Sequence, residues 1–230
     1  MVSAHRISVF LVCVGLTSTS TGQIRSAISS LHEIEIFAGA SSVTFTGLGF
    51  PEFNQSKIGF TGGIGGNWQV SHAVLVSAKL QYERRGVRRS YETHYFDDAS
   101  QEMIGTREET TNLDYLSLPL SARVLLTRKL FLDGGVYLSY LWAAQNLTNL
   151  SWKGTDTYNA IDYYTPFDFG LRFGIGYRVS INTSSDFLVW ASCENGLVDV
   201  STQTSSVYET ARNLAVTIGV SFCITRNKKG

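Results

Sequence analysis

The sequence predicts an all-β fold, an eight-stranded antiparallel up-and-down transmembrane β-barrel, and three observations lead to this prediction. Apolar and polar residues alternate through most of the chain, as in FDFGLRFGIGYRVS at 167–180. The polar connections between these segments are short and long in strict succession along the chain. One face of the segments is small or charged, and the other is bulky and apolar. Because successive strand residues point to opposite sides, each segment is a ribbon with one face suited to lipid.

Composition and length agree with a single exported domain rather than a nucleic-acid-binding protein. The chain has 230 residues, enough for one large β domain. Charged residues make up 17%, below the roughly 25% of ordinary soluble proteins. The formal net charge is zero, so nothing favours nucleic acid as a partner.

The N-terminus has the layout of a secretory signal peptide, which we predict to span residues 1–22 and to be cleaved. A basic start, MVSAHR, is followed by the apolar stretch ISVFLVCVGL and then by small residues. The apolar stretch is shorter than the roughly 20 residues of a spanning helix. We expect a short periplasmic segment at 23–32, the barrel at 33–224 and a basic tail at 225–230.

Eight alternating segments are the predicted strands, and most are longer than the usual strand of about 5–6 residues. A tilted strand needs about 9–11 residues to cross a bilayer, which these segments provide. No segment keeps the apolar spacing of a helix. The predicted strands are 33–45, 57–70, 73–90, 112–126, 129–147, 165–180, 185–199 and 210–224.

The connections predict which end of each strand faces the periplasm. Tight turns are expected at 71–72, 127–128 and 181–184, and long polar loops at 46–56, 91–111, 148–164 and 200–209. Transmembrane barrels have short periplasmic turns and long outer loops. We therefore expect periplasmic termini, four outer loops and an outer-membrane location.

The polar face is predicted to line the lumen and to fill it with ion pairs. An eight-stranded barrel is just wide enough for side chains, and charges without water need partners. Strand glycines on this face are expected to make room for the long charged side chains. A conduction path for ions is the alternative. The predicted network is Lys79, Glu83, Arg85, Arg123, Asp133, Asp168, Arg172, Arg178 and Glu194.

The apolar face is predicted to contact lipid, with aromatic girdles at the two interfaces. Four aromatics fall near the short-turn end, namely Trp68, Tyr177, Phe187 and Phe222. Four others fall near the long-loop end, namely Tyr82, Tyr140, Trp142 and Phe167. Outer-membrane lipid is thus an expected partner.

Three stretches resemble a known family. LDYLSLPLSARVLL at 113–126 carries Tyr115, Leu118, Pro119 and Leu120; KLFLDGGVYLSYL carries Gly134 and Gly135; DFGLRFGIGYRV carries Asp168, Gly170, Gly174, Gly176 and Tyr177. They resemble the outer-membrane β-barrel domain proteins of Bacteroidota, the PorT-like or "porin family" group, which is similar in plan to OmpX and OmpA. The resemblance implies an eight-stranded outer-membrane barrel and little about activity.

The last predicted strand, ARNLAVTIGVSF, alternates up to the aromatic Phe222. Barrel-assembly machinery commonly reads such a closing strand, so this machinery is an expected partner. Other envelope proteins are possible partners that the sequence does not identify.

Candidate sites outside the lumen are few. Arg84, Arg88 and Arg89 near the outer rim are candidates for contacts with lipid A phosphates, since arginine suits phosphate. His94, beside Asp97 and Asp98, is the candidate base of a membrane hydrolase, although no G-x-S-x-G motif is present. Carboxylates of the same loop could bind cations, or the loop is simply solvated: Asp97, Asp98, Glu102, Glu108 and Glu109.

No cofactor, metal site or disulfide is predicted. Cys193 and Cys223 lack metal spacing and are expected near opposite ends of one hairpin. The predicted function is a non-enzymatic barrel with a plugged lumen and a structural, adhesive or secretion-assisting role. The alternatives are a small-solute or ion pore, a lipid-modifying hydrolase and a secreted lipocalin-like carrier. The last would bury the apolar face.

Overall fold

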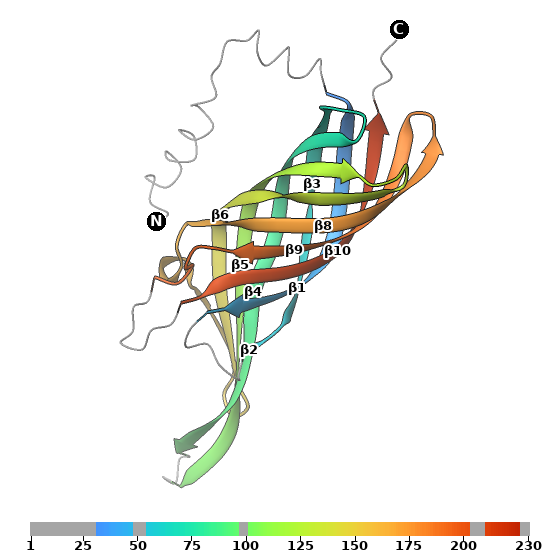
Figure 1. Ribbon diagram of the computed structural model, residues 1–230. Coiled ribbons are helices and arrows are strands. Elements are labelled where there is room, and N and C mark those ends of the chain that lie inside the picture. The colour runs from blue at the N-terminus through green and yellow to red at the C-terminus, as the bar shows by residue number, and fades with distance from the viewer. Residues whose placement is uncertain (1–30, 48–53, 97–100, 203–209, 226–230) are drawn as a thin grey trace.

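Eight antiparallel strands close into a barrel in the computed structural model, which describes residues 31–47, 54–96, 101–202 and 210–225 (Figure 1). Around the ring the order is β4, β3, β1, β10, β9, β8, β6 and β5, and β5 pairs again with β4. The strands are β1 (Glu33–Thr46), β3 (Lys57–Gln69), β4 (Val74–Phe96), β5 (Glu102–Leu125), β6 (Leu130–Leu150), β8 (Phe167–Asn182), β9 (Ser185–Gly196) and β10 (Arg212–Thr225). The predicted fold class is confirmed.

Three short elements lie outside the ring. β2 (Asn54–Gln55) pairs with β4, and β7 (Gly154–Asn159) pairs with β6. A 3-10 turn, η1, covers Ile161–Tyr163. Among the described residues, no helix is long and apolar enough to cross a membrane. The predicted signal peptide, residues 23–30 of the next segment and residues 226–230 of the tail lie outside the described residues.

The barrel turns its polar face inward. In β8, Asp168 and Arg172 are buried, whereas 62% of Phe173 is exposed. β10 repeats the pattern, with Thr217 buried beside Ile218, of which 67% is exposed. Side chains that alternate this way leave the apolar rows for a lipid solvent and keep the charges inside. The lipocalin-like alternative, which buries the apolar rows, is wrong.

The lumen is layered rather than uniformly polar. Near the short turns lies an apolar layer of Phe37, Phe131, Leu188, Trp190 and Cys223. We call this the lower apolar layer. Near the opposite end, where the long connections lie, is the upper apolar layer, made of Phe45, Val87, Leu113, Tyr115, Leu141, Ala144, Ala160, Val200 and Ala211. Most of the charged side chains lie between these layers.

Two of the predicted long loops are mostly strand, which corrects the expectation for 91–111 and 148–164. β4 and β5 stay paired out to Phe96 and Glu102, and β6 continues to Leu150 beside β7. We call the extension the protruding sheet: residues 88–96, 102–112 and 144–150 with β7. It projects past the other strands at the lower end of the view (Figure 1). A solvated sheet and a loop cannot be told apart by sequence pattern here, because neither needs a regular row of apolar residues.

The short connections form tight turns. Leu126 N donates to Leu130 O over 2.9 Å, and the hydroxyl of Thr127 accepts from the backbone N–H of Leu130 over 2.9 Å.

Cys193 is exposed and Cys223 is buried, and both are free thiols. They lie on opposite faces of the barrel wall.

Candidate functional site: the closed lumen and the protruding sheet

Two clusters of charged side chains lie in the lumen, and we call the one nearer the end opposite the short turns the upper charged cluster. Arg85 is at its centre. Its Nη1 donates to Asp168 Oδ2 over 2.7 Å. Its Nη2 lies 2.7 Å from Glu83 Oε1 and 2.6 Å from Glu194 Oε2. The guanidinium carbon lies 4.5 Å from the ring centroid of Tyr137. One buried cation thus serves three carboxylates from three strands.

Neutral donors complete the bonding of those carboxylates. The hydroxyls of Ser117 and Ser139 donate to Glu83, the latter over 3.3 Å. Asn213 Nδ2 donates to Asp168 Oδ2 over 2.9 Å. Arg172 provides a second cation by pairing with Glu194. Hydrogen bonds of this kind offset the loss of hydration that a buried carboxylate suffers.

The lower charged cluster is arranged around Glu35. Lys79 Nζ lies 2.7 Å from Glu35 Oε1, and Arg123 Nη2 lies 3.3 Å from its Oε2. Arg123 also pairs with Asp133 over 3.2 Å. Ser221 donates to Glu35 over 2.8 Å. These groups connect five strands across the lumen.

Closer to the short turns, Arg178 joins two further carboxylates. Its Nη1 lies 2.8 Å from Glu33 Oε1 and 3.0 Å from Asp186 Oδ2. The nine charged residues singled out in the sequence therefore all lie in the lumen, and each pairs with an opposite charge.

Three lumen carboxylates were missed by the sequence reasoning: Glu33, Glu35 and Asp186. The alternation E-I-E-I at the start of β1 was the available signal for the first two. Asp186 is the buried neighbour of Phe187 on β9, so alternation along this strand turns its side chain inward. With these three, the paired charges described in the lumen comprise five cations and seven carboxylates.

A cavity of about 10 Å³ lies beside the lower cluster, and it is lined by Lys79, Arg123, Phe131, Asp133, Arg172, Gly174, Ile175, Trp190, Ala191 and Ser192. Among the described residues, Arg123 Nη1, Asp133 Oδ1 and Ser192 Oγ have no hydrogen-bond partner. The cavity has room for roughly one water molecule, which would bond such groups. A space of this size is a hydration site rather than a channel.

A lid closes the lumen at the end opposite the short turns. We define the lid as residues 160–165 and 199–202. Thr165 N donates to Val200 O over 2.9 Å, and Thr202 N donates to Tyr163 O over 3.0 Å. The Asp199 carboxylate accepts from Ser201 N and Ala211 N, each over 3.0 Å.

The lid is apolar on its lumen side. Ala160 and Val200 are fully buried in the upper apolar layer, and Tyr164 packs against it. Burial raises the pKa of Tyr164. The lumen is therefore blocked by two apolar layers and by the paired charges between and beside them.

The protruding sheet carries ordered aromatic side chains. Tyr95 and Trp152 stack with ring centroids 4.0 Å apart and planes 6° apart. A Cβ on Gly105 would lie 2.4 Å from the Trp152 ring, so glycine lets the indole lie on the sheet. Tyr91 donates to Glu109 over 3.0 Å, and burial together with this bond raises its pKa.

The candidate sites outside the lumen are dispersed. Arg84 forms a two-bond pair with Asp114, and Arg88 pairs with Glu108 over 3.0 Å. Arg89 has the opposite parity on β4 and so does not share a face with Arg84 and Arg88. The contact of these arginines with lipid A stays a prediction.

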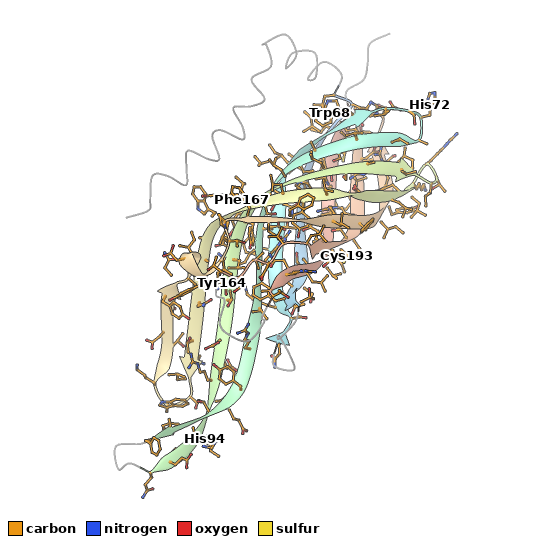
Figure 2. All side chains as sticks on the ribbon, turned by 60° about the vertical axis from the view of Figure 1, so that its left-hand side comes forward. Trp68, His72, His94, Tyr164, Phe167 and Cys193 are labelled. Carbon is orange, nitrogen blue, oxygen red and sulfur yellow. The ribbon has the colours of Figure 1, made fainter. Side chains whose placement is uncertain are left out.

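His94 lies near the tip of the protruding sheet (Figure 2). Its Nδ1 is 2.8 Å from Glu102 Oε1, and both side chains are more than half exposed. Glu109 pairs with Arg107 over 2.6 Å. Asp97 and Asp98 lie outside the described residues. Within the described part, no group of three or more His, Cys, Asp or Glu is arranged to hold a metal.

The eight predicted girdle residues all point away from the lumen. Trp68 lies near the turn that carries His72, and Phe167 lies farther along the barrel (Figure 2). Tyr140 and Phe167 contact each other with centroids 5.5 Å apart, and 70% of Trp142 is exposed. Their position at the two membrane interfaces stays a prediction.

Comparisons with known proteins agree with a membrane barrel. The family model described as "Outer membrane protein beta-barrel domain" matches residues 23–202. A comparison with curated proteins gives no match.

Among solved structures, Ail, the attachment invasion locus protein of Yersinia pestis, is 12% identical with a TM-score of 0.40, over 84% of this chain and 99% of that chain. Neisserial surface protein A is 12% identical with a TM-score of 0.44, over 84% and 97%. The outer membrane protease OmpT of Escherichia coli is 7% identical with a TM-score of 0.38, over 85% and 97%.

Proposed function

Because this chain belongs to the outer membrane protein β-barrel domain family, we propose that it is a closed, non-enzymatic barrel that presents the protruding sheet to partners outside the cell. One observation carries the proposal. β4, β5 and β6 run without interruption from the lumen wall into the protruding sheet. The barrel thus holds the sheet as a stiff extension rather than as a set of loops.

The protruding sheet has the features of a binding surface. Every residue of β7 is exposed, and in the described residues β7 pairs with β6 alone. A strand with one free edge presents backbone N–H and C=O groups to a partner. The stacked Tyr95 and Trp152 add an ordered aromatic surface close by. An adhesive role uses all of these features.

The lumen supports the closed state over the pore alternative. Arg85 and Arg123 each bridge carboxylates of different strands across the lumen. The lid adds an apolar layer above them. The hydrolase alternative has less support, because His94 and its partner Glu102 are solvated at the tip of the sheet.

Several finer points are also proposals. The Tyr-to-Pro stretch of β5, with Pro119 within the strand, supports membership of the PorT-like group. Residues 1–22 support export by a cleaved signal peptide. β10, which ends its alternation at Phe222, supports assembly by the barrel-assembly machinery, with outer-membrane lipid around the apolar rows.

Planar-bilayer recording tests the closed lumen. The folded mature chain is expected to give no discrete conductance steps, because apolar layers and ion pairs block the path. A general porin, reconstituted in the same way, provides the positive control. Regular steps that change size in Arg172→Ala would favour the pore instead.

Removing the protruding sheet tests the binding role. Residues 90–108 are replaced by an Asn-Gly turn, which joins the paired residues Arg89 and Glu109, and residues 146–158 by a second Asn-Gly turn, which joins the paired residues Gln145 and Asn159. The variant is expected to keep heat-modifiable gel migration, because the deletion spares both charged clusters. Its adhesion to other cells or to extracellular matrix should fall at least about tenfold, a loss of roughly 1.4 kcal/mol. Unchanged adhesion with an intact barrel would contradict the proposal.

A further inference from the structure

We propose that Lys57, Arg84 and Asp114 form a site on the outer surface of the barrel for the phosphate of an anionic membrane lipid. This inference does not depend on the proposed binding role of the protruding sheet. Arg84 and Asp114 are paired neighbours on β4 and β5 and point away from the lumen. They lie where the lipid-facing rows end and the protruding sheet begins.

The surroundings of the site are those of a lipid–water boundary. On β3, Ile58 and Phe60 are largely exposed, at 76% and 49%. On β5, Leu118 and Leu120 continue the apolar row toward the short turns. Arg88 and Glu108 begin the solvated pairs on the other side. A lipid whose acyl chains lie along the apolar rows would bring its headgroup to Arg84.

The orientation of Arg84 is set before any ligand binds. Its Nε and Nη2 donate to the two oxygens of Asp114 over 2.6 and 2.9 Å. Its guanidinium carbon lies 5.5 Å from the ring centroid of Phe60. Asp114 binds the Nε–Nη2 edge, and the Tyr82 hydroxyl also bonds to this pair, so the Nη1 side of the guanidinium is the side that faces away from the carboxylate. The planar donors on that side suit a phosphate oxygen.

Lys57 reaches the same place from another strand. Its amine donates to Asn112 on β5, although β4 lies between β3 and β5. The β4 residue opposite Asn112 is Gly86, which has φ of +139° and no side chain. A Cβ there would lie 2.0 Å from Thr111 O. This clash with the backbone of β5 explains the glycine, and since Gly86 has no side chain, none lies on β4 at the point where the lysine reaches Asn112.

The charges of the site are unbalanced in favour of an anion. Lys57 interacts electrostatically with Arg84, by repulsion, and with Asp114, by attraction. Two cations share one carboxylate, so the site carries a net charge of +1. The lysine has further N–H donors besides the one used for Asn112. A phosphate between the two cations would offset their repulsion and bond to both.

Native mass spectrometry of the folded mature chain in dodecyl maltoside micelles tests the site, with dioleoyl phosphatidic acid as the added lipid. The wild type is expected to retain one phosphatidic acid. The double variant Lys57→Met/Arg84→Met should bind at least about tenfold more weakly, because two charge-assisted hydrogen bonds are lost. Arg107→Met, which removes a partly exposed arginine of the protruding sheet that pairs with Glu109, is the matched control and should bind as the wild type does.

Three outcomes would overturn the proposal. The control variant could weaken binding as much as the double variant, which would indicate general charge attraction. Inorganic phosphate could displace the lipid at equal concentration, which would indicate a site for free phosphate. Finally, Arg84→Met leaves Asp114 without its partner, so Lys57→Met is also measured alone. It preserves the Arg84–Asp114 pair, and wild-type binding by this variant would contradict the role of Lys57.

Discussion

Replacing Arg85 by methionine is expected to lower the free energy of unfolding by about 3–5 kcal/mol, because it leaves buried carboxylates without their cation. Arg85 is 1% exposed and pairs with Glu83, Asp168 and Glu194. Of these three carboxylates, only Glu194 keeps a second cation among the described residues, namely Arg172. The measurement is the fraction of heat-modifiable, folded protein along a urea titration in lipid vesicles.

The matched control is Arg88→Met on the same strand. Arg88 and Glu108 form an exposed pair, so a change within about 0.5 kcal/mol is expected. Adding Glu83→Gln and Asp168→Asn to the Arg85 variant should restore part of the stability, since both amides are neutral. If Arg85→Met and Arg88→Met unfold at the same urea concentration, the lumen cluster does not stabilise the barrel.

Gly176→Ala is expected to destabilise the barrel by about 1–3 kcal/mol through overpacking. A Cβ at Gly176 would lie 2.1 Å from Cζ of Phe131, and this ring is 1% exposed. The ring belongs to the lower apolar layer and is further packed by Arg123, whose guanidinium carbon is 4.4 Å from its centroid. It therefore has little freedom to move aside. The same urea titration measures the loss.

Gly134→Ala provides the control for an added methyl group. Gly134 faces outward, and the nearest atom to its Cβ would be Phe173 Cδ1 at 3.7 Å, an ordinary contact. Its stability should stay near that of the wild type. Phe131→Leu in the Gly176→Ala background should recover stability by making room for the methyl group. A loss that is equal in both glycine variants would indicate a backbone effect instead.

These glycines refine what was expected from the sequence. Strand glycines were predicted to make room for long charged side chains, and Gly65, whose Cβ would lie 2.8 Å from Cγ of Lys79, does so. Gly176 and Gly219 instead make room for the rings of Phe131 and Trp190. The alternation pattern gives the face of each glycine, but the neighbour it accommodates comes from an adjacent strand.

The protruding sheet shows where the sequence pattern stopped being informative. An apolar row marks a strand in the barrel wall, because lipid requires it on one face. Beyond Val87 and Leu113 the regular apolar row ends, although Phe96, Met103 and Ile104 are exposed near the tip, so residues 91–111 resembled a loop. Pairing there depends on cross-strand contacts such as Arg88–Glu108 and the stack of Tyr95 on Trp152. Such contacts are invisible until the register is known.

The sequence by itself determined the number of barrel strands and which face of each is turned inward. Alternation is a local property, so Arg172 and Phe173 are assigned to opposite faces without knowledge of any other strand. Only the tertiary structure decided which inward groups meet. Arg85 contacts Glu194, 109 residues away, and Lys79 contacts Glu35. These side-chain contacts follow from the stagger of the strands in the closed barrel. Local alternation does not encode that stagger.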